Sequence, residues 1–114
     1  MPPRKWKLRI QDILESVDAI QGYVRGMDLE SFAGNQQVLD AVEYRFAVIG
    51  EATANIPDEI VDAHPEIPWR QMRGMRNVMV HAYFGVNTDT LWGTIQNDLP
   101  PLVPLLRSLL GPET

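Results

Sequence analysis

The chain has 114 residues, of which 45% are apolar, and it carries a formal net charge of −5. This length fits one domain and the apolar share suffices for a packed core, so we expect a single domain over residues 1–114. The absence of cysteine excludes disulfides, cysteine-ligated zinc and a thiol nucleophile. The two histidines, His64 and His81, have no accompanying ligand motif, so we expect no metal and no other cofactor.

No apolar run approaches the roughly 18 to 20 residues that a membrane-spanning helix needs. The basic first residues are followed by a charged amphipathic segment, whereas a signal peptide would have an apolar block there. We therefore expect a cytoplasmic protein.

The first two helices are predicted from apolar residues at helical spacing. In the first helix these residues are Ile10, Ile13, Leu14, Val17, Ile20 and Val24. In the second they are Val38, Val42, Phe46, Ile49, Thr53 and Ile56. Gly26 and the polar stretch 28–35 end the first helix, and Asn35 is the predicted N-cap of the second. Pro57 either stops the second helix or starts a short turn.

A third helix is predicted from Trp69 to about Phe84, with Gly85 as its C-terminal signal. Its buried side would carry Met72, Met75, Met79 and Ala82.

The fourth helix would begin at a cap formed by Asn87 or Thr88. Its core face would be formed by Leu91, Ile95, Leu99, Leu102, Leu106 and Leu109. The pattern leaves open whether Pro100, Pro101 and Pro104 kink this helix or interrupt it. No segment alternates with a period of two, and the connections are short, so we predict an all-α, antiparallel bundle of four to five helices.

The charge is unevenly distributed along the chain. The 22 residues between Glu66 and Asp89 contain no acid and hold three arginines. This window therefore has a formal charge of +3, and the rest of the chain has a formal charge of −8, which together give the net −5. A local positive field in an acidic protein indicates one anion-binding site better than it indicates a general nucleic-acid surface. Chance clustering of arginines on a solvated helix is the alternative.

The third helix also gathers side chains suited to phosphodiester chemistry. At about 100° per residue, Arg73, Asn77 and His81 share one strip, with Arg76 and Tyr83 on the next. Imidazole titrates near neutrality and can move the proton of an RNA 2′-hydroxyl. A guanidinium can stabilise the negative charge of the transition state without a metal.

Each of these residues also has an ordinary structural explanation. A histidine near a helix end is more often a charge partner of the C-terminus, and a tyrosine there is usually a packed ring. The arginines Arg70 and Arg73 are candidates for binding substrate phosphates. Arg73 is equally well explained by an ion pair with Glu51.

The segment Arg76-Asn77-Val78-Met79-Val80-His81-Ala82-Tyr83 resembles the R-x4-H-x-Y signature of the HepT-like branch of the HEPN superfamily. The flanking segments 67–75 and 83–86 are similar to that family as well. So are Ile49-Gly50-Glu51-Ala52 in the second helix and Asp98-Leu99-Pro100 in the fourth. The resemblance thus extends over nearly the whole chain.

The resemblance implies a HEPN-like bundle that forms a homodimer, in which the third helices of both subunits line one cleft. Members are toxins of type II toxin–antitoxin pairs that cut RNA without a metal, beside a minimal nucleotidyltransferase antitoxin. By this resemblance Arg76, Asn77 and His81 are the catalytic residues, and Tyr83 is the acceptor of an AMP that silences the nuclease. The alternative is a non-catalytic HEPN module that docks a nucleotidyltransferase or a nucleotide.

Overall fold

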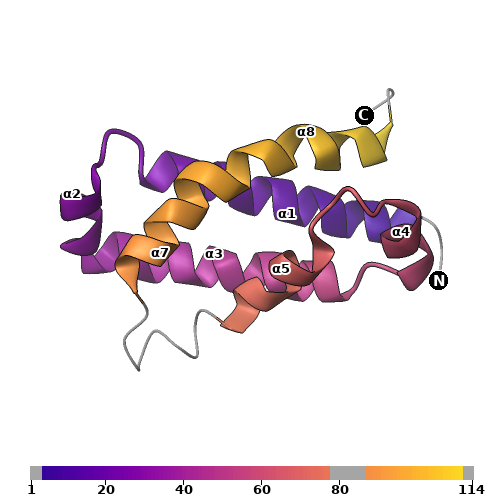
Figure 1. The fold of residues 1–114 in the computed structure, drawn as a ribbon, viewed down its shortest axis with the longest axis horizontal. Coiled ribbons are helices and arrows are strands. Elements are labelled where there is room, and N and C mark those ends of the chain that lie inside the picture. The colour runs from indigo at the N-terminus through magenta and orange to yellow at the C-terminus, as the bar shows by residue number, and fades with distance from the viewer. Residues whose placement is uncertain (1–3, 78–86, 112–114) are drawn as a thin grey trace.

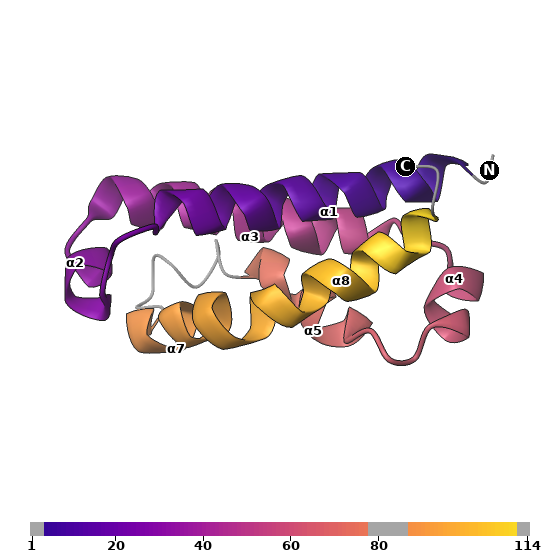
Figure 2. The ribbon, with the colours of Figure 1, turned by 90° about the horizontal axis from the view of Figure 1, so that it is seen from above.

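The protein folds as two layers of helices in a computed structural model that describes residues 4–77 and 87–111. The long helices α1 (Arg4–Tyr23) and α3 (Gln36–Ala54) lie side by side and antiparallel (Figure 1). The second layer, formed by α7 (Thr88–Gly93), α8 (Leu99–Leu110) and α5 (Trp69–Gly74), covers one face of this pair (Figure 2). The described residues form no strand, so the predicted all-α bundle is confirmed.

The ends of the two long helices follow the predicted signals. Gly26 adopts a positive φ of 80° just past α1, a backbone conformation that glycine tolerates and other residues rarely adopt. The side-chain oxygen of Asn35 accepts a hydrogen bond from the Val38 amide at 3.1 Å, so Asn35 is the N-cap of α3. Pro57 then starts α4 (Asp58–Ala63) rather than a turn.

The polar stretch 28–35 contains a helix that the sequence analysis did not predict, α2 (Leu29–Ala33). Asp28 accepts a hydrogen bond from the Ser31 amide at 2.8 Å, and the Ser31 hydroxyl accepts one from the Asp28 amide at 3.0 Å. This reciprocal capping box holds the helix start. The bond from the Ser31 amide also keeps the pKa of Asp28 below its ordinary value. The cap is therefore complete at neutral pH and is lost only when the pH falls through that lowered pKa.

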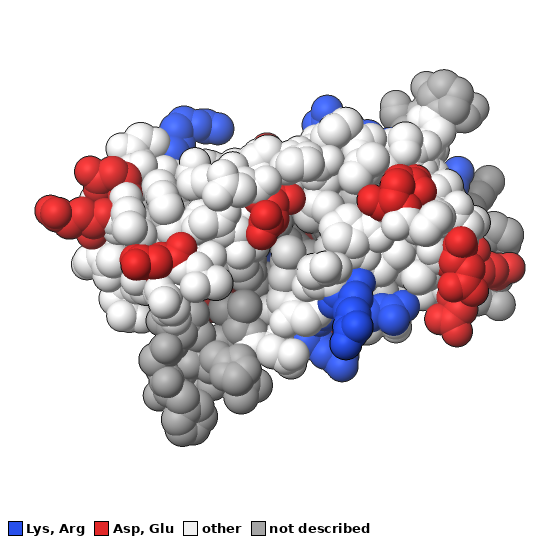
Figure 3. Space-filling model, viewed as in Figure 1, with Lys and Arg blue, Asp and Glu red and all other residues white. Residues whose placement is uncertain are grey.

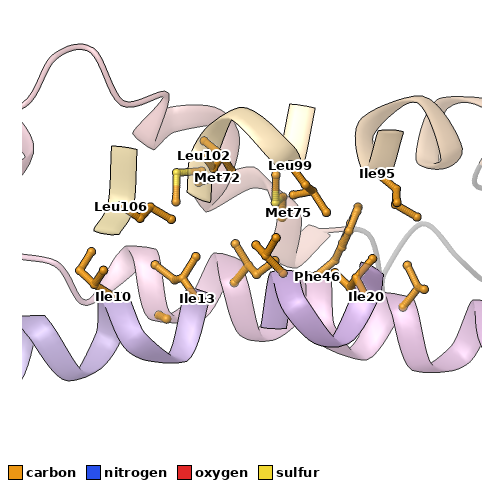
Figure 4. Close-up of a cluster of buried hydrophobic side chains, with 14 of the residues drawn as sticks. Ile10, Ile13, Ile20, Phe46, Met72, Met75, Ile95, Leu99, Leu102 and Leu106 are labelled. Carbon is orange, nitrogen blue, oxygen red and sulfur yellow. The ribbon is translucent and has the colours of Figure 1, made fainter. Parts of the chain in front are cut away.

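The core is formed where the two layers meet (Figure 4). Ile10 and Ile13 of α1 face Leu106 of α8, and Ile20 lies farther along α1 beside Phe46 of α3; all of these side chains are buried. Among the described residues, the largest fully buried side chains are Phe32, Phe46, Ile10, Ile13, Ile20, Ile49, Met72, Ile95, Leu99, Leu106, Val17 and Val42. The helical stripes predicted from the sequence therefore form one continuous core.

The proline-rich fourth segment bends without breaking. The π-helix η2 (Thr94–Asp98) joins α7 to α8, and the Leu99 amide donates to the Thr94 carbonyl five residues earlier. In an unbroken α-helix, the carbonyls of Gln96 and Asn97 would need amides at positions 100 and 101, which are prolines. A wider turn at this point lets the chain continue into α8, which also contains Pro104. At its start, Asn87 caps α7.

None of the helices within residues 4–77 and 87–111 combines the length and the apolar character needed to span a bilayer.

Candidate active site

The structure places Arg76 on a short 3-10 helix, η1 (Met75–Asn77), that follows α5 directly. The predicted third helix begins at Trp69 as expected, but the prediction is wrong for residues 75–77, because α-helical geometry ends at Gly74. Glycine has a low helix propensity, and the chain tightens into the narrower turn just after it. The α-helical strip expected for Arg73 and Asn77 is accordingly not formed across residues 74–77. The rest of that helix, with His81 and Tyr83, lies outside the described residues.

The backbone of η1 lies directly against Gly50 of α3. A Cβ atom built on Gly50 would lie 2.7 Å from the Arg76 Cβ and 2.9 Å from the Arg73 carbonyl oxygen, and closer still to the Arg76 amide nitrogen. Only glycine permits this approach of two backbones. The sequence analysis gave Gly50 no role, although a glycine inside a strongly periodic helix is a signal of close packing.

Substitution of Gly50 by alanine is expected to lower the free energy of unfolding by about 1–3 kcal/mol, since backbone atoms must move to admit the methyl group. The same change should displace Arg76 from its position beside Glu51. Denaturant unfolding measures the loss of stability. Gly22→Ala in α1 is the matched control, because nothing lies within 4 Å of its added Cβ. Equal stability of the two variants would contradict this packing.

The Arg76 side chain forms an ion pair with Glu51, with 3.7 Å between Nη1 and Oε2. This corrects the alternative in which Glu51 pairs with Arg73. The Arg76 and Glu51 side chains are 53% and 65% exposed. A pair this exposed contributes at most about 1 kcal/mol to stability, so the guanidinium can exchange Glu51 for a more strongly charged ligand.

The other two arginines of the window flank the same site on α5. Arg70 is exposed, and Arg73 is half-buried, with no hydrogen-bond partner for its Nε among the described residues. Figure 3 shows a cluster of basic side chains over α5, with acidic groups toward both ends of the molecule and a further acidic group near the middle of the same face. The local positive field predicted from the sequence therefore occupies one surface.

Asn77 is exposed and lines a groove between α5 with η1 on one side and α7, η2 and α8 on the other. Asn87 lines the same groove. Asn77 and Asn87 are the described residues on either side of the segment that carries His81 and Tyr83. Of the candidate residues in the described ranges, the structure brings Arg70, Arg73, Arg76 and Asn77 to this region.

The described residues contain no group of three or more histidine, aspartate or glutamate side chains placed to hold a metal ion. The candidate groups that the structure places here are cationic or amide side chains, which suit anions and polar ligands.

Comparison with known proteins matches residues 13–109 to the family described as "Ribonuclease HepT-like". The chain is 40% identical over 99 residues to "Probable ribonuclease HepT" of Thermococcus cleftensis, covering 87% of this chain and 90% of that protein. A "Putative RNase" of Methanocaldococcus jannaschii is 38% identical over 102 residues, covering 90% and 84%. One of Caldanaerobacter subterraneus is 32% identical over 104 residues, covering 91% and 93%. No solved structure matches the chain significantly. The family match covers most of the chain, which therefore belongs to the HepT-like ribonuclease family.

Proposed function

We propose that the protein is a metal-independent endoribonuclease that cuts RNA by attack of a 2′-hydroxyl on the adjacent phosphorus. The 2′-oxygen loses its proton, a bond forms between this oxygen and phosphorus, and the bond from phosphorus to the 5′-oxygen breaks. The 5′-oxygen takes up a proton as it leaves. The products carry a 2′,3′-cyclic phosphate and a 5′-hydroxyl.

The observation that carries the proposal is the exposed guanidinium of Arg76, held by a weak ion pair beside two further arginines. Its planar fork can bind two oxygens of a phosphate and stabilise the charge that grows in the transition state. Arg70 and Arg73 would bind neighbouring phosphates of the substrate strand.

In this proposal His81 accepts the 2′-hydroxyl proton, since an imidazole titrates near neutral pH. Asn77 orients the imidazole or binds a phosphate oxygen. The test is incubation of the purified protein with single-stranded RNA in EDTA. Cleavage is the expected result, whereas the alternative of a non-catalytic binding module predicts binding of a nucleotide or partner without cleavage.

We further propose that two copies pair so that their motifs line one cleft. Met72 of α5 and Met75 of η1 are buried in the core of the protomer itself, so they do not form this interface. The support for pairing is that a chain of this size gains buried area by it. Light scattering at micromolar concentration is expected to give the mass of a dimer. A stable monomer would count against a shared cleft.

Regulation by a minimal nucleotidyltransferase, as part of a cytoplasmic toxin–antitoxin pair, completes the proposal. In this step the Tyr83 oxygen would bond to the α-phosphorus of ATP, lose its proton and release pyrophosphate. The AMP so attached would bring a phosphate to the motif and compete with RNA for Arg76. Tyr83→Phe is expected to keep nuclease activity and to resist inactivation by the partner with ATP. Intact mass measurement after co-expression checks this. An AMP adduct that survives Tyr83→Phe would show that another residue is the acceptor.

A further inference from the structure

The groove beside η1 has a cavity volume of about 990 Å³, large enough for a nucleobase and its sugar. Its floor is apolar and includes Phe46, Met72 and Leu102. Amide and hydroxyl side chains lie around it on both sides. The described polar lining residues other than aspartate are Gln71, Asn77, Asn87, Thr90, Thr94 and Asn97.

Asp98 is the one charged residue among the described residues that line this groove. It occupies the N-cap position of α8, yet its side chain makes no capping hydrogen bond. No ion pair to it is formed within residues 4–77 and 87–111 either. The exposed Asp98 side chain is therefore the charged hydrogen-bond acceptor that the described residues present to this groove.

We infer that the groove binds a guanine base of single-stranded RNA, with the Asp98 carboxylate accepting hydrogen bonds from guanine N1–H and the N2 amino group. The inference rests on the proposed ribonuclease function and assigns it a base preference. The apolar floor would contact the face of the base, and the arginines of α5 and η1 would bind the adjoining phosphates.

The chemistry of the four bases separates guanine from the rest. An ionised carboxylate only accepts hydrogen bonds, and its two oxygens suit two neighbouring donors. Guanine is the base whose pairing edge presents two donors side by side. Uracil would place carbonyl oxygens against the carboxylate, and adenine and cytosine would each place a ring nitrogen lone pair there. A site of this kind rejects ligands that leave its acceptors unpaired.

The positions of the charged side chains favour a base, rather than a phosphate or a second protein chain, as the occupant of the groove. The described residues that line it carry no cation, and a phosphate would meet the Asp98 carboxylate. The cations lie instead on α5 and η1, whose other residues, Gln71 and Met72 among them, form the groove wall. A nucleotide can thus place its phosphate and its base on adjacent parts of one surface.

The inference can be tested by equilibrium binding of fluorescent oligonucleotides with 2′-fluoro sugars, which cannot undergo attack by a 2′-hydroxyl. An adenine hexamer containing one guanine is compared with the same hexamer containing inosine, which lacks the N2 amino group. We expect the wild type to bind the guanine hexamer about ten-fold more tightly than the inosine hexamer. In Asp98→Asn this difference should vanish, while affinity for an all-adenine hexamer stays unchanged.

Asp89→Asn is the matched control, because Asp89 is an exposed acid of α7 that is absent from the described groove lining. This variant should keep the full preference for guanine. Equal binding of guanine and inosine by the wild type, or a preference that survives in Asp98→Asn, would overturn the inference. The inference would also be overturned if Asp98→Asn changed the oligomeric mass of the protein without changing its base preference. That result would assign the groove to a second copy of the chain. Since binding is measured without cleavage, selective binding by a protein that does not cut RNA would leave this inference standing and refute the ribonuclease proposal alone.

Discussion

His81→Ala is expected to lower the rate of RNA cleavage by a factor of about 10² to 10⁴, the usual contribution of a positioned acid or base. The imidazole would be the group that removes the 2′-hydroxyl proton, because imidazole is the side chain suited to moving protons near neutral pH. A single-turnover assay with excess enzyme measures the chemical step directly.

His64→Ala is the matched control, since His64 is the other histidine of the chain. It lies at the end of α4, where its Nδ1 is 3.3 Å from a Glu66 carboxylate oxygen. This variant should cut RNA at the wild-type rate. Thermal unfolding of both variants checks that the fold is retained, and full activity in His81→Ala would refute the proposed role.

Arg76→Ala is expected to slow cleavage by about 10² to 10³, comparable to removing one donor from an oxyanion site. The structure limits the accompanying loss of stability, because the Arg76 side chain is half exposed and its ion pair with Glu51 spans 3.7 Å. Activity should therefore fall far more than the free energy of unfolding. Arg76→Lys should restore little, because a point charge cannot reproduce the guanidinium fork.

Arg107→Ala provides the comparison, as it removes an exposed arginine from the last turn of α8. It should leave cleavage unchanged. If Arg76→Ala and Arg107→Ala had the same small effect, general electrostatic attraction of RNA would explain the arginines better than catalysis does.

Sequence patterns predicted the long elements well because apolar periodicity and capping residues act locally. The stripes of α1 and α3, the Asn35 cap and the Asn87 cap are all present in the structure. The short elements were missed or misjudged for different reasons. Helix α2 depends on a reciprocal cap between Asp28 and Ser31 within a stretch that looks like a loop. The π-helix accommodates the lack of amide N–H groups at Pro100 and Pro101. The sequence pattern left open whether these prolines would kink the helix or interrupt it.

The candidate site could be predicted in composition but not in geometry. The acid-free window correctly located the basic surface on α5 and η1. The switch to a 3-10 turn at Met75 was not predictable from helical spacing, because it accompanies the contact with Gly50 on a distant helix. The ion-pair partner of Glu51 depends on the same contact. The groove arises from packing between segments and had no sequence signal of its own. Asp98 was noted in the sequence only as part of the family-like segment Asp98-Leu99-Pro100, which did not indicate that it lines a groove.

The most direct test of the ribonuclease proposal is cleavage of a defined RNA oligonucleotide in EDTA, followed by analysis of the product ends by mass spectrometry. The same oligonucleotide with a single 2′-deoxy sugar at the cut position is the matched substrate. We predict that the all-ribose strand is cut to a 2′,3′-cyclic phosphate and a 5′-hydroxyl, and that the deoxy position remains intact. Cleavage at the deoxy position, 5′-phosphate products, or a strict requirement for magnesium would contradict the proposal.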